Sequence, residues 1–209
     1  GRIGYMMFYS FDQWIADPVL VFKLWEGGMS FHGGLIGVVI STALVARKFR
    51  IPFLVLSDFI VPLVPTGLLY GRLANFVNQE LWGRATDVPW AMIFPADPTG
   101  TPRHPSQLYE ALGEGLLLFL ILSWFASKPR LKGEVSGLFL LLYGFVRFLI
   151  EFVRQPDVQF QDVEALFELF NWMTQGQWLS VPMIIAGFWL MRTATGLGHK
   201  DSAQGGKRQ

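Results

Sequence analysis

Residues 51–70 read IPFLVLSDFIVPLVPTGLLY, an apolar run with one charged side chain, that of Asp58. An α-helix needs about 20 such residues to cross the hydrocarbon core of a bilayer. Residues 71–83 continue as GRLANFVNQELWG, where charged and amide side chains interrupt the apolar ones. The sequence therefore predicts a membrane-spanning helix that ends in a polar segment.

The same pattern recurs along the chain, which is 52% hydrophobic with a mean hydropathy of +0.37. Charged clusters separate apolar segments at residues 29–45, 51–70, 111–126, 135–150 and 178–191. We expect an all-α fold, a polytopic transmembrane helical bundle with about five complete spans. Residues 1–8 look like the second half of one more span, so we expect a missing N-terminal segment. The alternative is a soluble bundle of buried apolar helices.

The positions of the basic residues orient the spans. Three apolar segments are followed by basic clusters, namely Arg47, Lys48 and Arg50; Lys128, Arg130 and Lys132; and Arg192 with Lys200, Lys207 and Arg208. By the positive-inside rule these ends face the cytoplasm. Alternation then places residues 11–28, 71–110 and 151–177 on the outer side, where most of the tryptophans also lie as interfacial anchors.

This topology defines the expected organisation of the chain. We predict one transmembrane domain over residues 1–192. Within it, residues 71–110 are rich in Pro and Gly and should form a small irregular cap on the outer face. Residues 193–209 are polar and should form a disordered cytoplasmic tail.

The composition excludes several classes of function. The chain has no Cys, which rules out disulfides, a cysteine nucleophile and Cys metal sites. Any nucleophilic sulfur must therefore belong to a substrate. The His, Asp and Glu residues show no metal-ligand spacing and no phosphate-binding Gly loop is present, so we expect no metal and no cofactor. The net charge of +1 argues against a nucleic-acid partner.

His32 lies at the predicted outer start of a span, in the stretch Ser-Phe-His-Gly-Gly over residues 30–34. An imidazole at that depth can act as a base, an acid or a hydrogen-bond donor. An interfacial histidine bonded to a backbone carbonyl explains the same pattern.

A second polar group follows the span at residues 51–70. If the helix continues, Arg72, Asn75 and Gln79 share one face by their i, i+3, i+7 spacing. A guanidinium beside amides suits a phosphate oxyanion. A capping arginine that extends to the lipid headgroups is the alternative.

A third group ends the predicted span at residues 135–150. Tyr143, Arg147, Glu151 and Arg154 are spaced to line one stripe of a helix. Glu151 would orient Arg147 and leave part of its guanidinium for an anion, unless the group is a Glu–Arg network without a ligand.

The topology, derived from other residues, brings all three groups to the same leaflet. Ionisable groups at membrane depth are costly and need a paired, solvated or functional explanation. The convergence predicts an outer-leaflet cavity that binds a phospholipid headgroup. Asp58 and Glu114 lie deeper and are expected to be internal hydrogen-bond partners, and His104 is expected to belong to a structural entry turn.

The run GRLANFVNQELWG over residues 71–83 resembles the signature of the bacterial prolipoprotein diacylglyceryl transferases. The resemblance extends through MSFHGG at 29–34, RHPSQLYE at 103–110 and residues 143–157, and covers the chain to about Met191. It implies a multi-pass enzyme of the bacterial inner membrane with seven spans when intact. The domain over residues 1–192 would be catalytic, with its active site toward the outer, periplasmic leaflet and its C-terminus in the cytoplasm.

The resemblance also implies the reaction and its partners. Diacylglyceryl would move from phosphatidylglycerol, among the membrane lipids, to the lipobox Cys thiol of a prolipoprotein signal peptide. A thioether would form and glycerol phosphate would leave. The motif positions that carry over to this chain are His32, Arg72, Asn75, Asn78, Glu80, Gly83, Tyr143, Arg147 and Glu151.

Alkyl transfer needs a thiolate and charge stabilisation on the departing phosphate. We therefore hypothesise that Arg72 and Arg147 hold the phosphate, while His32 accepts the thiol proton or positions the headgroup. The competing classes are a lipid transporter or scramblase, which would need a polar path to the inner leaflet, and a structural membrane subunit, which leaves the clustered arginines unexplained. An intramembrane protease fits less well because neither a Ser and His pair nor twin membrane aspartates are apparent.

Overall fold

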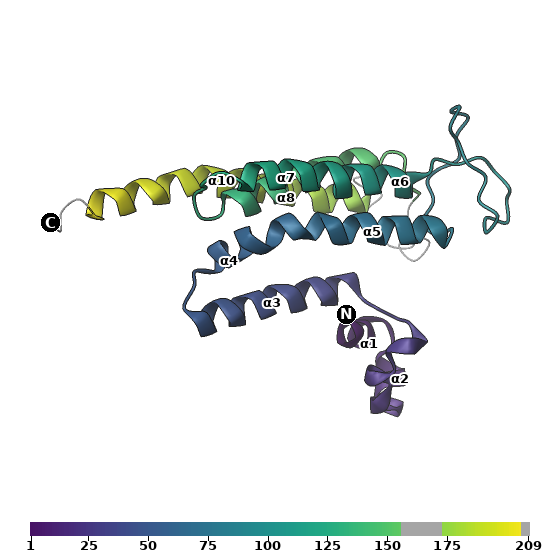
Figure 1. The fold of residues 1–209 in the computed structure, drawn as a ribbon. Helices are drawn as coiled ribbons and strands as arrows, with labels where there is room; N and C mark the ends of the chain where they lie inside the picture. Colours follow the sequence, from purple (N-terminus) through teal and green to yellow (C-terminus); the bar gives the residue numbers. More distant parts are fainter. Residues whose placement is uncertain (156–172, 206–209) are drawn as a thin grey trace. The chain divides into compact units, whose positions relative to one another are not determined.

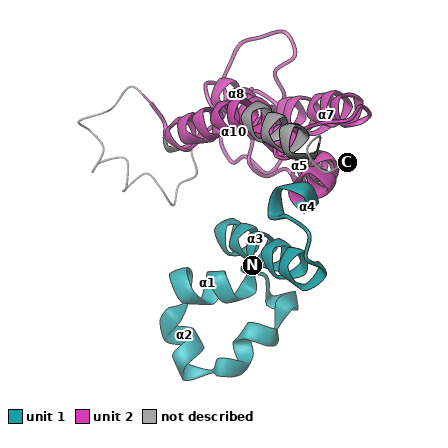
Figure 2. Cartoon of the chain, turned by 90° about the vertical axis from the view of Figure 1, so that its left-hand side faces the viewer, with its two compact units in different colours: residues 1–56 teal, residues 57–209 magenta. Residues whose placement is uncertain are grey.

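The structure, a computed structural model, describes residues 1–155 and 173–205. Within these ranges the regular elements are helices, with β pairing limited to isolated bridges, so the all-α prediction is confirmed. The chain divides into two compact units, Gly1–Leu56 and Ser57–Gln209, coloured teal and magenta in Figure 2. The two units are described separately below.

Unit 1 is built from short helices and one long one: α1 (Arg2–Tyr9), α2 (Phe11–Ala16), the 3-10 turns η1 (Pro18–Phe22) and η2 (Leu24–Glu26), and α3 (Phe31–Phe49). Two glycines allow α1 and α3 to cross closely, because a Cβ on Gly4 would lie 2.7 Å from Gly33 Cα. The Ser30 hydroxyl accepts a hydrogen bond from Gly33 N at 3.2 Å and caps α3. The long helix thus begins at the predicted site.

The apolar segment at residues 51–70 and the polar residues after it are largely helical. α4 (Phe53–Ile60) and α5 (Val64–Val77) are joined by one 3-10 turn, η3 (Val61–Leu63), where Pro62 and Pro65 interrupt regular α-helical hydrogen bonding. α5 runs past Tyr70 to Val77. Arg72 and Asn75 are therefore helical residues.

The other helices of unit 2 are α6 (Ser106–Glu110), the π-helical segment η4 (Ala111–Leu117), α7 (Leu118–Ala126), α8 (Glu134–Ile150) and α10 (Gln175–Gly205). In Figure 1, α7, α8 and α10 run alongside one another, with α5 packed along the same bundle. Glycines set the spacing of α8 and α10, because a Cβ on Gly187 would lie 2.5 Å from Leu141 N.

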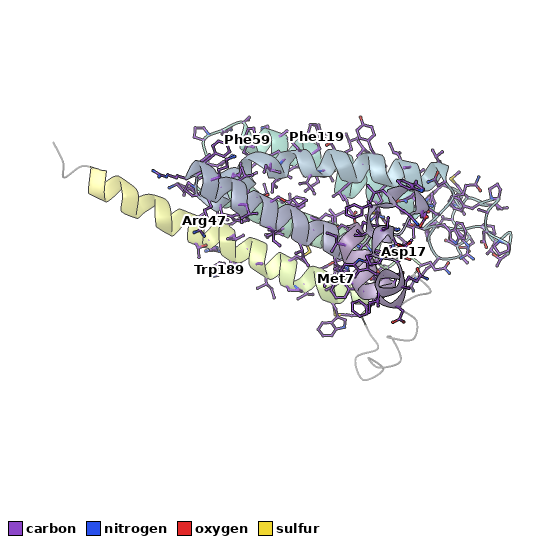
Figure 3. The ribbon with its side chains drawn as sticks, turned by 90° about the horizontal axis from the view of Figure 1, so that it is seen from below. Met7, Asp17, Arg47, Phe59, Phe119 and Trp189 are labelled. Carbon is purple, nitrogen blue, oxygen red and sulfur yellow. The ribbon has the colours of Figure 1, made fainter. Side chains whose placement is uncertain are left out.

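The buried core of unit 2 is small. Leu118, Leu122 and Val135 form its centre. Large apolar side chains instead project outward, such as Phe59 at 76% exposure and Trp189 at 62% (Figure 3). Such an apolar exterior is what a lipid-facing bundle presents.

Two helical runs are long and apolar enough to cross a membrane, Phe53–Val77 and Ser106–Ala126. Helices also occupy the other three predicted segments, but the count of five spans stays a prediction. α8 has 17 residues. At 1.5 Å per residue it covers about 25 Å, less than the roughly 30 Å hydrocarbon core.

The predicted cap is shorter than residues 71–110, because α5 ends only at Val77 and α6 begins at Ser106. The remaining segment, here called the 78–105 loop, is irregular and has isolated bridges from Ala85 and Met92 to Arg103. Its apolar centre is Phe94, 3% exposed and stacked on Trp82 with ring centroids 5.8 Å apart. Its position on an outer face stays a prediction.

The C-terminal part of the chain differs from the predicted pattern in one respect. The α10 backbone is helical to Gly205, across residues where the disordered tail was expected to start at position 193. Most of the predicted outer stretch at residues 151–177, including positions 156–172, lies outside the described residues, as do positions 206–209.

Candidate active site

Arg72 and Arg147 come together around two glutamates. Arg72 on α5 places Nε 2.5 Å from Glu110 Oε2 and Nη2 3.7 Å from Glu114 Oε2. Arg147 on α8 places Nη1 3.5 Å from Glu110 Oε1 and 3.6 Å from Glu114 Oε1. The two predicted phosphate ligands therefore share one pair of carboxylates.

The polar stripe predicted on α8 completes the cluster. Arg147 Nη2 lies 3.0 Å from Glu151 Oε2, as the i, i+4 spacing predicts. Arg154 places Nε 3.6 Å from Glu110 Oε1 and Nη1 4.0 Å from Glu151 Oε1. We call these six residues the charge cluster: Arg72, Glu110, Glu114, Arg147, Glu151 and Arg154. Its three guanidiniums and three carboxylates give a formal charge of zero.

The charge cluster is buried but incompletely hydrogen-bonded. The carboxylates of Glu110 and Glu114 are 1% and 0% exposed. Both oxygens of Glu114, Oε1 of Glu110 and Nη1 of Arg147 have no hydrogen-bond partner among the described residues. Buried charges that are paired without hydrogen bonds are costly to retain. A bound anion could accept a hydrogen bond from Arg147 Nη1 and so satisfy this donor.

A distortion of the helix places Glu114 between the two arginines. Glu114 lies in the π-helical segment η4, a rare form that occurs often at functional sites. A Cβ on Gly115 would lie 2.7 Å from Leu69 Cα of α5, and a Cβ on Gly113 would lie 2.7 Å from a Val146 methyl of α8. The two glycines therefore let η4 approach both arginine-bearing helices.

Asn75, Asn78 and Glu80 form a second polar group, here called the amide–carboxylate triad. Asn75 Nδ2 donates to Glu80 Oε1 at 2.8 Å, and Asn78 Nδ2 donates to the same oxygen at 3.3 Å. The prediction that Gln79 continues the helical face of Arg72 is wrong, because α5 ends at Val77. Gln79 has a φ of 57° and its Oε1 accepts from Ala96 N instead.

Gly83 lies where only glycine fits. A Cβ there would be 2.6 Å from Val153 O and 2.7 Å from His104 O. Gly83 N donates to His104 O at 2.9 Å, which pins the 78–105 loop to the residue that precedes Pro105 and α6. The loop therefore passes between the end of α8 and the start of α6.

Tyr143 and His32 occupy different surroundings. Tyr143 stacks on Phe139 with centroids 5.6 Å apart and packs against the core of unit 2, one turn before Arg147. His32 is an exposed residue of α3 whose ring meets Phe31 edge-on at 5.8 Å. It belongs to unit 1, whereas the arginines and glutamates of the charge cluster all belong to unit 2.

Glu110 and Glu114 were not among the predicted site residues. The available signal was two carboxylates four residues apart at the start of an apolar segment, which one helical face would carry. Glu114 was expected to be an internal hydrogen-bond partner, and it is an internal ion-pair partner of Arg72 and Arg147, at 3.7 and 3.6 Å. The same expectation for Asp58 is confirmed. Asp58 accepts from Gly133 N at 2.6 Å and from Ser136 N at 2.8 Å.

The 78–105 loop is held by a third polar group. Arg103 Nε donates to Asp97 Oδ2 at 2.5 Å, and Arg103 Nη1 donates to Gln155 Oε1 at 2.5 Å. The hydrogen bond from Arg103 lowers the pKa of the Asp97 carboxyl to about 2. His104 Nδ1 lies 3.3 Å from the Tyr109 hydroxyl, which accepts from Trp90 Nε1 at 2.6 Å. These contacts are structural, as expected for His104.

Known proteins resemble the chain along nearly its whole length. A family model described as prolipoprotein diacylglyceryl transferase matches residues 1–193. A Teredinibacter turnerae protein is 56% identical over 187 residues, which are 90% of this chain and 63% of that protein. A Bordetella bronchiseptica protein is 56% identical over 90% of this chain and 69% of its own length, and a Vibrio vulnificus protein is 57% identical over 95% and 71%. All three are named phosphatidylglycerol–prolipoprotein diacylglyceryl transferase. The chain therefore belongs to the prolipoprotein diacylglyceryl transferase family.

Proposed function

We propose that this chain transfers the diacylglyceryl group of phosphatidylglycerol to the lipobox Cys thiol of a prolipoprotein signal peptide, using the charge cluster to bind the phosphate. The observation that carries the proposal is the buried Arg147 Nη1, which has no hydrogen-bond partner within the described residues. It lies beside Glu110 and Glu114, which also hold Arg72. The names of the relatives supply the two substrates.

The reaction sets the chemical demands on the site. The thiolate sulfur forms a bond to the glyceryl carbon next to the phosphate, and the carbon–oxygen bond to that phosphate breaks. The electron pair stays on the phosphate oxygen, so glycerol phosphate leaves as an anion. The thiol proton passes to a base. The transition state gains negative charge on the phosphate and needs preorganised donors there.

Arg72 and Arg147 meet this demand in our proposal. Guanidinium groups bind phosphate through two parallel N–H donors. The carboxylates of Glu110, Glu114 and Glu151 hold the two side chains and offset their charge before the lipid arrives. A low-dielectric site strengthens the contact to the leaving phosphate.

The remaining predicted residues have supporting roles in this proposal. Asn75, Asn78 and Glu80 orient the glycerol headgroup through their amides and carboxylate. Gly83 lets the loop approach closely, and Tyr143 lines the same stripe of α8. His32 accepts the thiol proton, directly or through water, or else positions the headgroup.

The proposal includes a topology. The enzyme crosses the bacterial inner membrane several times, with the charge cluster in the outer leaflet and the C-terminus in the cytoplasm. The apolar exteriors of Phe53–Val77 and Ser106–Ala126 support the membrane location. The basic clusters after residues 45 and 126 support the orientation.

The test is a product assay. The full-length protein, purified in detergent, is incubated with phosphatidylglycerol and a lipobox peptide, and the peptide is analysed by mass spectrometry. We expect a diacylglyceryl adduct that is absent when the peptide Cys is replaced by Ser. A folded protein that binds phosphatidylglycerol and forms no adduct would contradict the proposal and favour lipid transport.

A further inference from the structure

The amide–carboxylate triad includes a turn that is closed only in part by its own backbone. Gln79 N donates to Phe76 O at 3.1 Å and Glu80 N donates to Asn75 O at 3.0 Å. The backbone leaves α5 after Val77, and Gln79 and Leu81 both have a φ of 57°. This left-handed region is unfavourable for residues other than glycine. Two such residues within three positions persist only where surrounding contacts fix them.

The start of α6 supplies the contacts to the carbonyls of Glu80 and Leu81. Gln107 Nε2 donates to Glu80 O at 2.7 Å, and Ser106 Oγ donates to Leu81 O at 3.1 Å. Gln107 is 1% exposed and Ser106 is 0% exposed. A buried side chain that donates to a loop carbonyl at these distances restrains the backbone of that loop.

The same short helix also holds Arg72. Gln107 and Glu110 are three residues apart on α6 and therefore lie on neighbouring positions of one face. Gln107 holds the backbone of Glu80, while Glu110 Oε2 lies 2.5 Å from Arg72 Nε. One turn of helix thus links the Glu80 backbone of the triad to the arginine.

We infer that Gln107, assisted by Ser106, is a positioning residue that sets Glu80, the carboxylate of the triad, at a fixed distance from Arg72. This inference rests on the proposed function. The phosphate at Arg72 and the headgroup glycerol at the triad belong to one lipid, so their separation decides how the glyceryl carbon is aligned with the thiolate. Misalignment lowers the rate without removing the phosphate contact.

The variant Gln107→Met removes the donor at similar side-chain volume. In the full-length protein, assayed with phosphatidylglycerol vesicles and a lipobox peptide, we expect kcat to fall about tenfold and KM for the lipid to change less. In a Glu80→Ala background, which has already lost the triad carboxylate, the same change should cost less than twofold, because the residue acts through Glu80. Equal losses in both backgrounds would overturn the positioning role.

Backbone amide exchange gives a readout that does not need the reaction. Exchange at residues 79–83 should rise in Gln107→Met and, to a smaller extent, in Ser106→Ala. Ser127→Ala is the matched control, because it also removes a hydroxyl that donates to a backbone carbonyl, that of Trp124 at 2.7 Å. Unchanged exchange at 79–83 in Gln107→Met overturns the inference even if the enzyme is active. A wild-type protein that forms no adduct contradicts the proposed function, whereas the exchange result still decides whether Gln107 holds the turn.

Discussion

Unit 2 contains two acidic sites that are built in opposite ways. Asp58, on α4, has its carboxylate hydrogen-bonded by Gly133 N, Ser136 N and Ser136 Oγ, at 2.6, 2.8 and 2.6 Å. It caps the first turn of α8, where helix N–H groups have no intrahelical acceptor. Glu114 is fully buried beside two arginines, and neither of its oxygens has a hydrogen-bond partner within the described residues.

The contrast separates a carboxylate that serves the fold from one that serves a ligand. A satisfied acceptor at a helix start contributes to stability and leaves little for a substrate to add. A buried polar group without a hydrogen-bond partner lowers the stability of the fold. Such groups are found where function requires them. Substitutions at the two sites should therefore change different observables.

The largest effect should come from Arg147→Ala. Loss of a preorganised donor to the departing phosphate should lower kcat by about 10²-fold or more. Adduct formation followed over time by mass spectrometry measures it. Arg147→Ala also leaves the negative charge of the buried glutamates unbalanced, which lowers stability. A second variant, Arg147→Lys, therefore keeps the positive charge and removes only the guanidinium. Near-normal turnover in both folded variants would remove Arg147 from the phosphate site.

A smaller loss is expected for Gly83→Ala. Its Cβ would lie 2.6 Å from Val153 O, so the loop must shift away from the end of α8. We expect kcat to fall about tenfold through displacement of the neighbouring triad. The control is Gly100→Ala in the same loop, where no atom lies within 4 Å of the added Cβ but φ is +59°. An equal loss in the control would show that loop conformation in general, and not the contact at Gly83, limits the rate.

Asp58→Ala should affect stability alone. Removing a side-chain cap costs about 1 kcal/mol, which lowers the midpoint of thermal unfolding by a few degrees. Turnover per folded molecule should stay at the wild-type value. A loss of activity without a loss of stability would show that Asp58 contributes to catalysis. It would contradict the structural role that distinguishes Asp58 from Glu114.

The smallest expected effect is that the 78–105 loop loses stability at low pH. The pKa of Asp97 is about 2 in the folded chain, below the ordinary value of 3.8, because Arg103 donates to the carboxylate. A depressed folded pKa gives stability that is present above 3.8 and lost as the pH falls toward 2. Amide exchange of the loop should therefore increase over that pH interval, and less so in Asp97→Asn. Equal acid sensitivity in both proteins would contradict this linkage.

Much of this architecture follows from local sequence patterns. The helices at 31–49 and 134–150 are predicted by apolar runs, and the Arg147–Glu151 pair follows from i, i+4 spacing. The partnership of Arg72 with Glu110 could not be predicted in this way. It depends on the packing of α5 against η4, which Gly115 and a π-helical distortion make possible.

The end of α5 shows a second limit of sequence reasoning. Helical spacing placed Gln79 beside Arg72, but the chain turns after Val77 into a left-handed conformation at Gln79. Backbone hydrogen bonds from Gln79 N to Phe76 O and from Glu80 N to Asn75 O close the turn, although position 79 is not the glycine that such a helix end favours. Contacts from Ser106 and Gln107, which lie far along the chain, hold the carbonyls that follow.

The most direct test of the central claim compares two isosteric changes, Glu110→Gln in the charge cluster and Asp58→Asn at the cap of α8. Both variants, in the full-length protein, are assayed for adduct formation and for thermal unfolding in the same detergent. We predict that Glu110→Gln lowers kcat per folded molecule at least about tenfold. It also lowers the unfolding temperature, because it removes a carboxylate that pairs with three largely buried guanidiniums. We predict that Asp58→Asn lowers the unfolding temperature and leaves kcat unchanged. Full activity in Glu110→Gln would contradict the claim that the charge cluster is the catalytic site.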